Sequence, residues 1–400
     1  MSRFVRPAVL VLLAVGLVLS TGRRVLTEVR RTQGRTVTVA TFNVQTLFDG
    51  EYDGGEFSEF NPYTSDWNDA AYGERLEILA THLRAFTPAG APDILSLQEI
   101  EGPDVLADLC ERVGRGMYPH RVCAPGESAM SVCIASRFPL NAAVVHGLDV
   151  WPGPDDPAVG SLRGMLEVAV HTPGGVVRVI AAHWKSAREG REATAHLRRL
   201  AARAAARATE SILKADPAAR VIVAGDLNEE ISEDSTILGP GGDAALRVVR
   251  LGAAASKRDI AAEDPPILYS PWSEIEGGSY VFRGRATRID HLLFSTGFFP
   301  DGFGRHAGLP GAGGETGADG ESPGGEPSLD GEPSPGGGVP ILGRRAGRGR
   351  TRERREALVY GSAHLVTDWA GEDGAPARYE SYARRGVSDH FALYAVLHAP

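Results

Sequence analysis

The sequence feature that most constrains the fold is an apolar run at residues 221–224, Val-Ile-Val-Ala, which Gly225, Asp226 and Asn228 follow closely. Four residues that are small or β-branched predict a short strand buried on both faces. Glycine lets the backbone turn or approach another segment closely, and Asp226 and Asn228 point to one side if the chain stays extended. The run therefore predicts either a core strand closed by an ordinary turn or a strand that ends in a catalytic carboxylate and amide.

Other strand-like runs in the chain end in the same kinds of polar side chain. Strands are predicted at residues 37–42, 93–97, 131–135, 166–170, 176–182, 288–295 and 391–397. The polar residues associated with these runs and with the run at 221–224 are Asn43, Glu99, His183, Asp226 with Asn228, Asp290, and Asp389 with His390, the last two directly before the final run. Each residue alone also fits a turn, a hydrogen-bonded histidine or a structural ion pair. Together they favour metal-assisted phosphoester hydrolysis, because the oxygen atoms suit a hard divalent cation and a histidine paired with a carboxylate can orient or deprotonate water.

Two helices and one further strand pair are predicted between these runs. Residues 74–86 place leucines on one helical face, and residues 192–214 form a longer Ala-rich stripe. The arginines of the second helix are expected on a solvated outer face. Residues 280–282 and 288–295 are expected to pair as neighbouring strands.

Composition and cysteine content limit the function classes. The 400 residues carry a formal net charge of −9, which excludes a global basic field for nucleic acid but not an enzyme that contacts a few phosphates. No serine lies in a nucleophile-elbow pattern, and no Cys/His set has zinc spacing. The three cysteines are too few for a disulfide scaffold. Cys123 and Cys133 flank a turn-like segment, and the sequence leaves open whether they form a cross-strand disulfide or stay buried thiols.

Two segments stand apart from the predicted catalytic domain at residues 35–400. Residues 1–34 contain a basic start and a short apolar core, which predicts a secretory signal peptide or an uncleaved signal anchor. The chain is therefore expected to be exported or associated with the cell envelope, with membrane association through this segment. Residues 304–356 are first rich in Gly, Pro and Glu and then in Arg, which predicts a disordered insertion. Its arginines fit a solvated tether or a contact with anionic lipid or nucleic acid.

The ordered set of motifs resembles the endonuclease/exonuclease/phosphatase superfamily, which includes DNase I-like nucleases. The motifs are Thr41-Phe42-Asn43-Val44, Leu97-Gln98-Glu99, Ala182-His183-Trp184-Lys185-Ser186, Gly225-Asp226-Leu227-Asn228, Arg288-Ile289-Asp290-His291 and Ser388-Asp389-His390. The resemblance implies an α/β fold of the α+β type. Specifically, it implies a four-layer α/β/β/α sandwich of two mostly antiparallel sheets with outer helices.

The resemblance also implies a metal site. Glu99 is expected to bind Mg²⁺, with Mn²⁺ as an alternative, and Asn43 is expected beside it. Asp389 is expected to support the metal directly or through its neighbours. Gln45 departs from the pattern, because some DNA-repair members carry an acidic residue near the metal, and this leaves open whether there are one or two metal positions.

The same resemblance assigns roles in the reaction. Asp226 is expected to position the water or the leaving group, and Asn228 to hold a phosphoryl oxygen. His390 and Asp290 are expected to form a dyad, and His183 to donate a hydrogen bond to the phosphate.

The substrate is expected to be a phosphodiester. Arg163 and Lys185 are predicted to bind it. A nuclease is favoured, while a phospholipid or sphingomyelin phosphodiesterase, a phosphatase for small esters and a non-catalytic binding module remain alternatives. No protein partner is implied.

Overall fold

The computed structural model describes residues 36–124, 129–147, 163–250, 267–299 and 358–399. The chain divides into two units, Met1–His306 with Glu356–Pro400, and Ala307–Arg355. The second unit lies wholly outside the described residues. The predicted signal segment at residues 1–34 and the predicted insertion at about 304–356, with its arginine cluster, also lie outside them.

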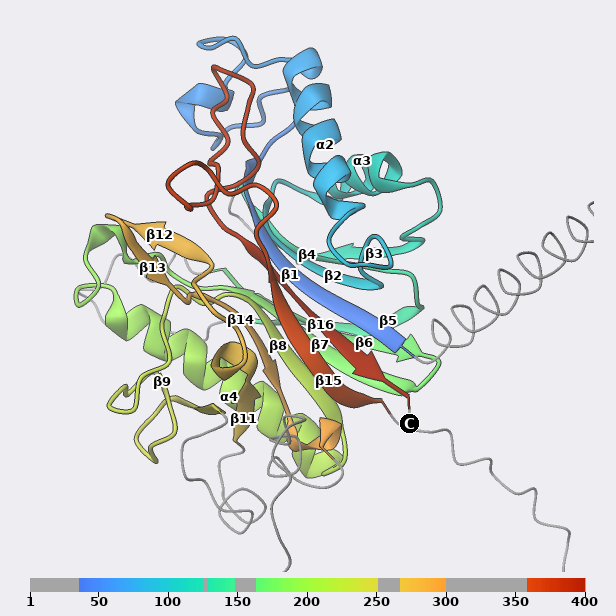
Figure 1. Ribbon diagram of the computed structural model, residues 1–400, viewed down its shortest axis with the longest axis vertical. Coiled ribbons are helices and arrows are strands. Elements are labelled where there is room, and N and C mark those ends of the chain that lie inside the picture. The colour runs from blue at the N-terminus through green and yellow to red at the C-terminus, as the bar shows by residue number, and fades with distance from the viewer. Residues whose placement is uncertain (1–35, 125–128, 148–162, 251–266, 300–357, 400) are drawn as a thin grey trace, which may run out of the picture. The chain divides into compact units, whose positions relative to one another are not determined.

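Two mixed sheets form the centre of the first unit (Figure 1). The six-stranded sheet runs in the order β15 (Val359–Val366), β16 (Ala392–His398), β1 (Thr36–Leu47), β2 (Ile94–Ile100), β4 (Ser131–Ser136) and β3 (His120–Cys123). The eight-stranded sheet runs in the order β5 (Leu140–His146), β6 (Met165–Thr172), β7 (Gly175–His183), β8 (Arg220–Asp226), β14 (Asp290–Phe294), β11 (Leu268–Ser270), β10 (Leu246–Arg250) and β9 (Leu238–Gly239). The pairs β1–β2, β7–β8, β9–β10 and β10–β11 are parallel, and the other neighbours are antiparallel.

Helices cover the outer faces of both sheets (Figure 1). The α2 helix (Asp69–Leu83) and the α3 helix (Pro103–Val113) pack on the six-stranded sheet, and the α4 helix (Ala195–Ala215) packs on the eight-stranded sheet. The α2 helix begins before its predicted start because the Asn68 side chain caps it, accepting from two backbone N–H groups of the first turn. Short 3₁₀ helices lie at Ser58–Phe60, Ala187–Glu189, Pro271–Ser273 and Thr296–Phe298. This arrangement confirms the predicted four-layer sandwich.

The strand residues alternate between two separate cores, as side chains of a pleated strand must. In β1, Val37 and Val39 face the core between the sheets, while Phe42 and Val44 face the core beneath α2 and α3. Burial on both faces explains why β1 and β8 read as nearly continuous apolar runs.

Gly225 is required by a close approach of two strands. Its φ is +150°, and a Cβ atom there would lie 1.8 Å from the carbonyl oxygen of Ala182 on β7. A side chain would therefore separate β7 from β8 at the point where both strands deliver their polar ends, which confirms the predicted need for glycine.

The predicted pairing of residues 280–282 with 288–295 is wrong. Instead, β12 (Tyr280–Phe282) pairs with β13 (Arg285–Thr287) in a separate hairpin, and β14 pairs with β8 and β11. Arg283 and Gly284 both have positive φ, 51° and 78°, which is the backbone of a two-residue hairpin turn. The turn closes before residue 288, so the following strand is free to join the large sheet.

The expectation that the arginines of the α4 helix form a solvated face is also wrong for one of them. Arg198 is fully buried, and its Nε donates to Oε2 of Glu229 at 2.7 Å. The guanidinium also donates to the side chain of Thr194 and to the carbonyl oxygen of Arg191. A buried carboxylate partner thus draws this arginine inward.

A disulfide joins Cys123 on β3 to Cys133 on β4, where the two residues lie opposite each other in the ladder. This decides between the two alternatives that the sequence left open. Within the described part of the chain, no helix combines the length and apolar character that a membrane span needs.

Candidate active site

The polar strand ends meet in a single cavity of about 740 Å³. Parallel pairing explains part of this convergence, because β1 and β2 end at one edge of their sheet and β7 and β8 end at one edge of theirs. Residues from both sheets line the cavity, among them Glu99, His183, Asp226, Asn228, Asp389 and His390.

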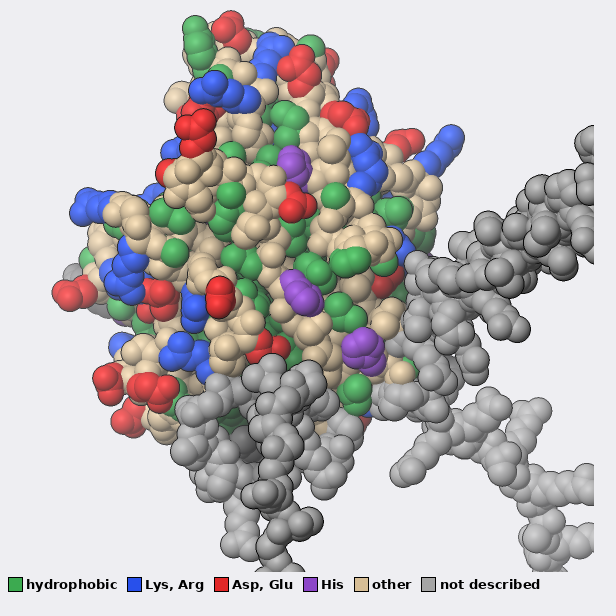
Figure 2. Space-filling view, viewed as in Figure 1, with side chains coloured by type: hydrophobic (Ala, Val, Ile, Leu, Met, Phe, Trp, Pro, Cys, Tyr) green, Lys and Arg blue, Asp and Glu red, His purple; other side chains and the backbone are tan. Residues whose placement is uncertain are grey.

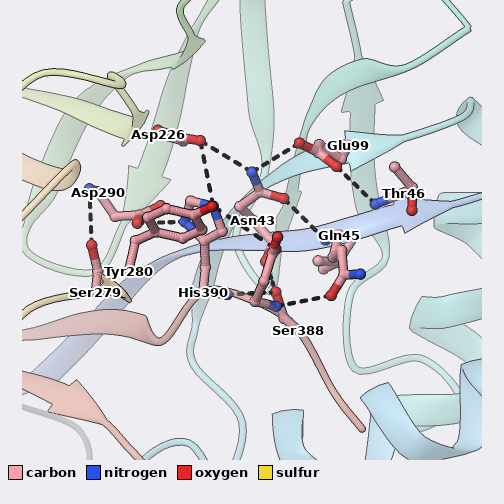
Figure 3. A network of polar contacts seen from close by, with 12 residues as sticks. Asn43, Gln45, Thr46, Glu99, Asp226, Ser279, Tyr280, Asp290, Ser388 and His390 are labelled. Atoms are coloured by element: carbon pink, nitrogen blue, oxygen red, sulfur yellow. Dashed lines mark hydrogen bonds and ion pairs between the residues drawn. The ribbon is translucent and has the colours of Figure 1, made fainter. Parts of the chain in front are cut away.

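The amide of Asn43 connects the two sheets (Figure 3). Its Nδ2 donates to Oε1 of Glu99 and to Oδ2 of Asp226, each at 3.1 Å. The second oxygen of Glu99 accepts from the backbone N–H of Thr46 at 2.9 Å. One neutral side chain therefore holds two carboxylates at a fixed separation.

Left-handed backbone conformations concentrate at this site. Four of the seven described non-glycine residues with positive φ are Gln45, Thr46, Glu99 and Asn228. The β1–β2 register also shifts between Asn43 and Leu47. Such conformations cost free energy and persist where the surroundings hold them in place, which is common at functional sites. They also correct the premise that the chain stays extended from Asp226 to Asn228.

His390 and Asp290 form the predicted pair. Nδ1 of His390 donates to Oδ2 of Asp290 at 2.7 Å, and both side chains are buried. The other oxygen of Asp290 has no hydrogen-bond donor among the described residues. Burial opposes the charge of the imidazole, but the carboxylates of Asp290 and Asp226 outweigh it, so the pKa of His390 lies well above its usual value. The ring is therefore held as a charged donor.

Asp226 lies between Asn43 and His390. Its Oδ2 accepts from Asn43 and lies 3.8 Å from Nε2 of His390, while its Oδ1 accepts from the backbone N–H of Asn228. Burial and the neighbouring Asp290 raise the pKa of Asp226 to about 7, against the opposing effect of His390. A carboxyl group with this pKa can accept or release a proton near neutral pH.

His183 is the last residue of β7. In the sheet, β7 lies on one side of β8, which carries Asp226, and β14, which carries Asp290, lies on the other side. Nδ1 of His183 lies 3.3 Å from Nη1 of Arg163. Because a guanidinium only donates, Nδ1 accepts and Nε2 carries the hydrogen. That Nε2 lies 3.8 Å from Glu99 and 3.6 Å from Asp226, too far for a hydrogen bond to either. Burial, followed by the charges of Arg163 and His390, places the pKa of His183 well below its usual value.

Two sets of residues have the chemistry to hold a cation. Ligand atoms of Asp226, Asp290 and His390 lie within 4.8 Å of one another, but Nδ1 of His390 and Oδ2 of Asp290 are already bonded to each other. Glu99 and Asp389 have partly exposed side chains, 19% and 16%, at the cavity. The carboxylate oxygens of Glu99 and Asp389 match the donor preference of Mg²⁺ or Mn²⁺. The predicted ligand Asn43 instead turns its nitrogen toward the carboxylates of Glu99 and Asp226, and its oxygen accepts from the backbone N–H of Gln45 at 3.0 Å.

Gln45 has a role that the sequence did not indicate. Its Oε1 accepts from the backbone N–H groups of Tyr379 and Asp389, each at 2.9 Å, and its Nε2 donates to the carbonyl oxygen of Tyr379 at 3.0 Å. Ser388 adds a second tie, because its hydroxyl donates to the carbonyl oxygen of Asn43 at 2.7 Å. These bonds fasten the segment before β16 to β1 (Figure 3).

The remaining predicted residues divide into two cases. Arg163 and Asn228 line the cavity, and the amide of Asn228 donates to the carbonyl oxygen of Trp184 at 3.1 Å. Lys185 does not line it, because its ammonium forms an ion pair with Glu189 at 2.7 Å. The nearby arginines that do line the cavity are Arg188 and Arg191.

Comparison with known proteins places this arrangement in a family. A model of the Endonuclease/Exonuclease/phosphatase family matches residues 38–302. No curated protein matches the chain. The similar solved structures include TDP2 from C. elegans, with 14% identity, 91% of this chain and 75% of that chain covered, and a TM-score of 0.47. An endonuclease/exonuclease/phosphatase from Bacteroides vulgatus has 14% identity, coverage of 91% and 99%, and a TM-score of 0.45. D. rerio TDP2 complexed with single strand DNA product has 13% identity, coverage of 91% and 99%, and a TM-score of 0.45.

Proposed function

Because the chain belongs to the endonuclease/exonuclease/phosphatase family, whose members hydrolyse phosphoesters, we propose that it is a divalent-cation-dependent phosphodiesterase that acts on nucleic acid. One observation carries the proposal. The pair His390–Asp290, the carboxyl group of Asp226 and the Asn43–Glu99 link converge on one cavity from both sheets.

The cation has a defined place in this proposal. Glu99 and Asp389 would hold Mg²⁺ or Mn²⁺, with Asn43 beside them. The bound ion would stabilise the negative charge that develops on phosphoryl and leaving oxygens. The amide of Asn43 orients the Glu99 carboxylate by a hydrogen bond. The amide oxygen of Gln45 fixes the position of Asp389 by accepting from its backbone N–H.

The chain's own residues divide the remaining work. His390 donates to a phosphoryl oxygen, because Asp290 keeps its ring charged and fixes its orientation. Asp226 accepts the proton of the attacking water, because its pKa of about 7 matches that task. His183 supplies a neutral N–H through Nε2, since Arg163 occupies Nδ1.

Arginines around the cavity support a polyanionic substrate. Arg163, Arg188, Arg191, Arg283 and Arg378 line it, although the whole chain has a net charge of −9. A local group of guanidinium side chains binds phosphates without a global basic field.

Hydrolysis of bis(4-nitrophenyl) phosphate tests the reaction class directly. We expect no turnover after EDTA treatment and recovery when Mg²⁺ or Mn²⁺ is added. Full activity of metal-stripped protein would overturn the cation dependence. A parallel panel of DNA, RNA, sphingomyelin vesicles and small monoesters distinguishes a nuclease from a sphingomyelin phosphodiesterase and from a phosphatase.

We also propose that the chain is exported or held at the cell envelope. The Cys123–Cys133 disulfide supports this, because disulfides persist in oxidising compartments. Fractionation of expressing cells, with thiol labelling of the recovered protein, measures both properties. Reduced protein confined to the cytoplasm would contradict the proposal.

A further inference from the structure

The β12–β13 hairpin stands at the rim of the active-site cavity and carries an exposed aromatic ring. Phe282 lies at its tip with 54% of its surface exposed, and it lines the same cavity as His390 and Asp226. Because more than half of this ring is exposed at the cavity, it is available to contact a ligand there.

The base of the hairpin is tied to both members of the dyad. The hydroxyl of Ser279 accepts from the backbone N–H of Asp290 at 3.1 Å, and the carbonyl of Ser279 accepts from the N–H of Phe391 at 2.7 Å. The ring of Tyr280 packs against the ring of His390 with 4.8 Å between centroids (Figure 3). The tip is therefore held at a fixed place relative to the reacting groups.

The tip also carries a positive charge without a carboxylate partner. The guanidinium carbon of Arg283 lies 5.1 Å from the centre of the Phe282 ring, and Arg283 forms no ion pair with any described residue. The backbone φ of Arg283 is 51°, in the left-handed region that residues other than glycine rarely adopt. Figure 2 shows Lys and Arg side chains gathered at the edge where Figure 1 places the hairpin.

We propose that the β12–β13 hairpin binds single-stranded nucleic acid next to the scissile phosphodiester, with an unpaired base stacked on Phe282 and a neighbouring phosphate on Arg283. This inference rests on the proposed phosphodiesterase function. An aromatic face beside a cation matches a nucleotide, which presents a base and a phosphate at that spacing. The base is unpaired, because in a duplex the neighbouring bases cover both of its faces.

A lipid surface fits the rim less well. Among the described residues, Phe57 is the other large exposed apolar side chain at the cavity, 44% exposed, and it packs against Phe48 on the loop after β1 rather than against Phe282. Two separate rings with arginines around them make no continuous apolar face, which insertion into a bilayer requires.

The variant Phe282→Ala tests the stacking. For a single-stranded octanucleotide we expect KM to rise roughly ten-fold, the size of one lost base–aromatic stack, and Phe282→Trp to restore it. Turnover of methyl 4-nitrophenyl phosphate, which has no base, should stay unchanged. Tyr63→Ala is the matched control, because Tyr63 is 82% exposed and does not line the cavity.

The variant Arg283→Gln tests the phosphate contact through salt. Loss of one contact should reduce the slope of log KM against log salt by about 0.7 for a single strand. An unchanged slope together with an unchanged KM for Phe282→Ala would overturn the inference.

The substrate panel distinguishes a failure of the hairpin inference from a failure of the proposed phosphodiesterase function. If methyl 4-nitrophenyl phosphate and duplex DNA are hydrolysed with Mg²⁺ but the single-stranded octanucleotide is not, the inference fails and the proposed function stands. If Phe282→Ala loses activity on sphingomyelin vesicles instead, the hairpin is a lipid contact and the inference also fails. If no diester is hydrolysed, the proposed function itself fails.

Discussion

Removing one carboxylate charge should have different effects at Glu99 and at Asp226. Glu99→Gln should mainly raise the Mg²⁺ concentration needed for half-maximal activity, because a ligand charge is lost while Asn43 still positions the side chain. Asp226→Asn should instead lower turnover at saturating Mg²⁺ by roughly 10²- to 10⁴-fold, because it removes a proton acceptor. Metal titrations of both variants measure this. Equal shifts in metal dependence and equal turnover would refute the division of roles.

His291 predicts an acid-sensitive step in stability. It is fully buried, its Nε2 donates to the carbonyl oxygen of Glu229 at 2.9 Å, and burial lowers its pKa to about 4. The unfolded chain therefore binds a proton near pH 6.5 that the folded chain accepts only near pH 4. The free energy of unfolding should fall as pH drops through this window, and His291→Gln should remove about 2 kcal/mol of the loss between pH 7 and pH 5.

Urea unfolding at the two pH values measures this effect. Wild type and His291→Gln with the same pH dependence would contradict it.

At the residue scale, the sequence identifies side chains that end strands but not those that hold them. Asn43, Glu99 and Asp226 follow apolar runs and His390 precedes one, so their convergence can be predicted from the order of the motifs. Gln45 cannot be predicted in this way. Its partners are the backbone groups of Tyr379 and Asp389, 334 and 344 residues away, and no local pattern marks such a contact.

At the scale of elements, the α4 helix and the loop after β8 depend on one buried ion pair. Glu229 accepts from Arg198 at 2.7 Å and from Arg191 at 2.8 Å, directly after Asn228. Arg198→Ala should destabilise the fold by about 3–5 kcal/mol, because it leaves a buried carboxylate without its main partner. Urea unfolding measures the loss. The control is Arg207→Ala on the exposed face of the same helix, for which less than about 0.5 kcal/mol is expected.

A loss of similar size in both variants would show that the helix, and not the ion pair, is responsible.

The error in strand pairing has a local cause. Residues 280–282 and 288–295 both have strand-like composition, and nothing in the apolar pattern assigns them to different sheets. The deciding feature is the Arg283–Gly284 turn, where arginine takes a conformation that favours glycine, asparagine or aspartate. Gly284 is typical of such a hairpin turn, but Arg283 before it is not, so the sequence did not indicate the hairpin.

At the scale of the whole chain, residues 308–350 are expected to add little to stability. Their Gly-, Pro- and Glu-rich sequence offers little apolar area to bury. Deleting them should therefore leave the melting temperature nearly unchanged, as calorimetry of the full chain and the deletion variant measures. A large decrease would show that the segment packs on the domain. A selective loss of activity on DNA or vesicles would show that its arginines bind substrate.

The layering of the fold was predicted from the ordered motifs and not from periodicity. Alternation in β1 and the stripe of α4 indicate strands and helices, but they do not reveal that β7 and β8 run parallel while β14 joins them antiparallel. That topology depends on contacts between segments far apart in the sequence. It also brings Asp290 to Asp226, directly opposite it in the ladder.

The most direct test of the account is a double-mutant cycle on His390 and Asp290. If the two act as one unit in phosphodiester hydrolysis, His390→Ala and Asp290→Ala should each lower kcat by roughly 10³-fold, and the double variant should lose little more. Circular dichroism and urea unfolding report the folded fraction of each variant, so that turnover is compared per folded molecule. Additive losses, or variants that unfold while the folded fraction keeps its turnover, would contradict the account and leave the pair as a structural tie for the last strand.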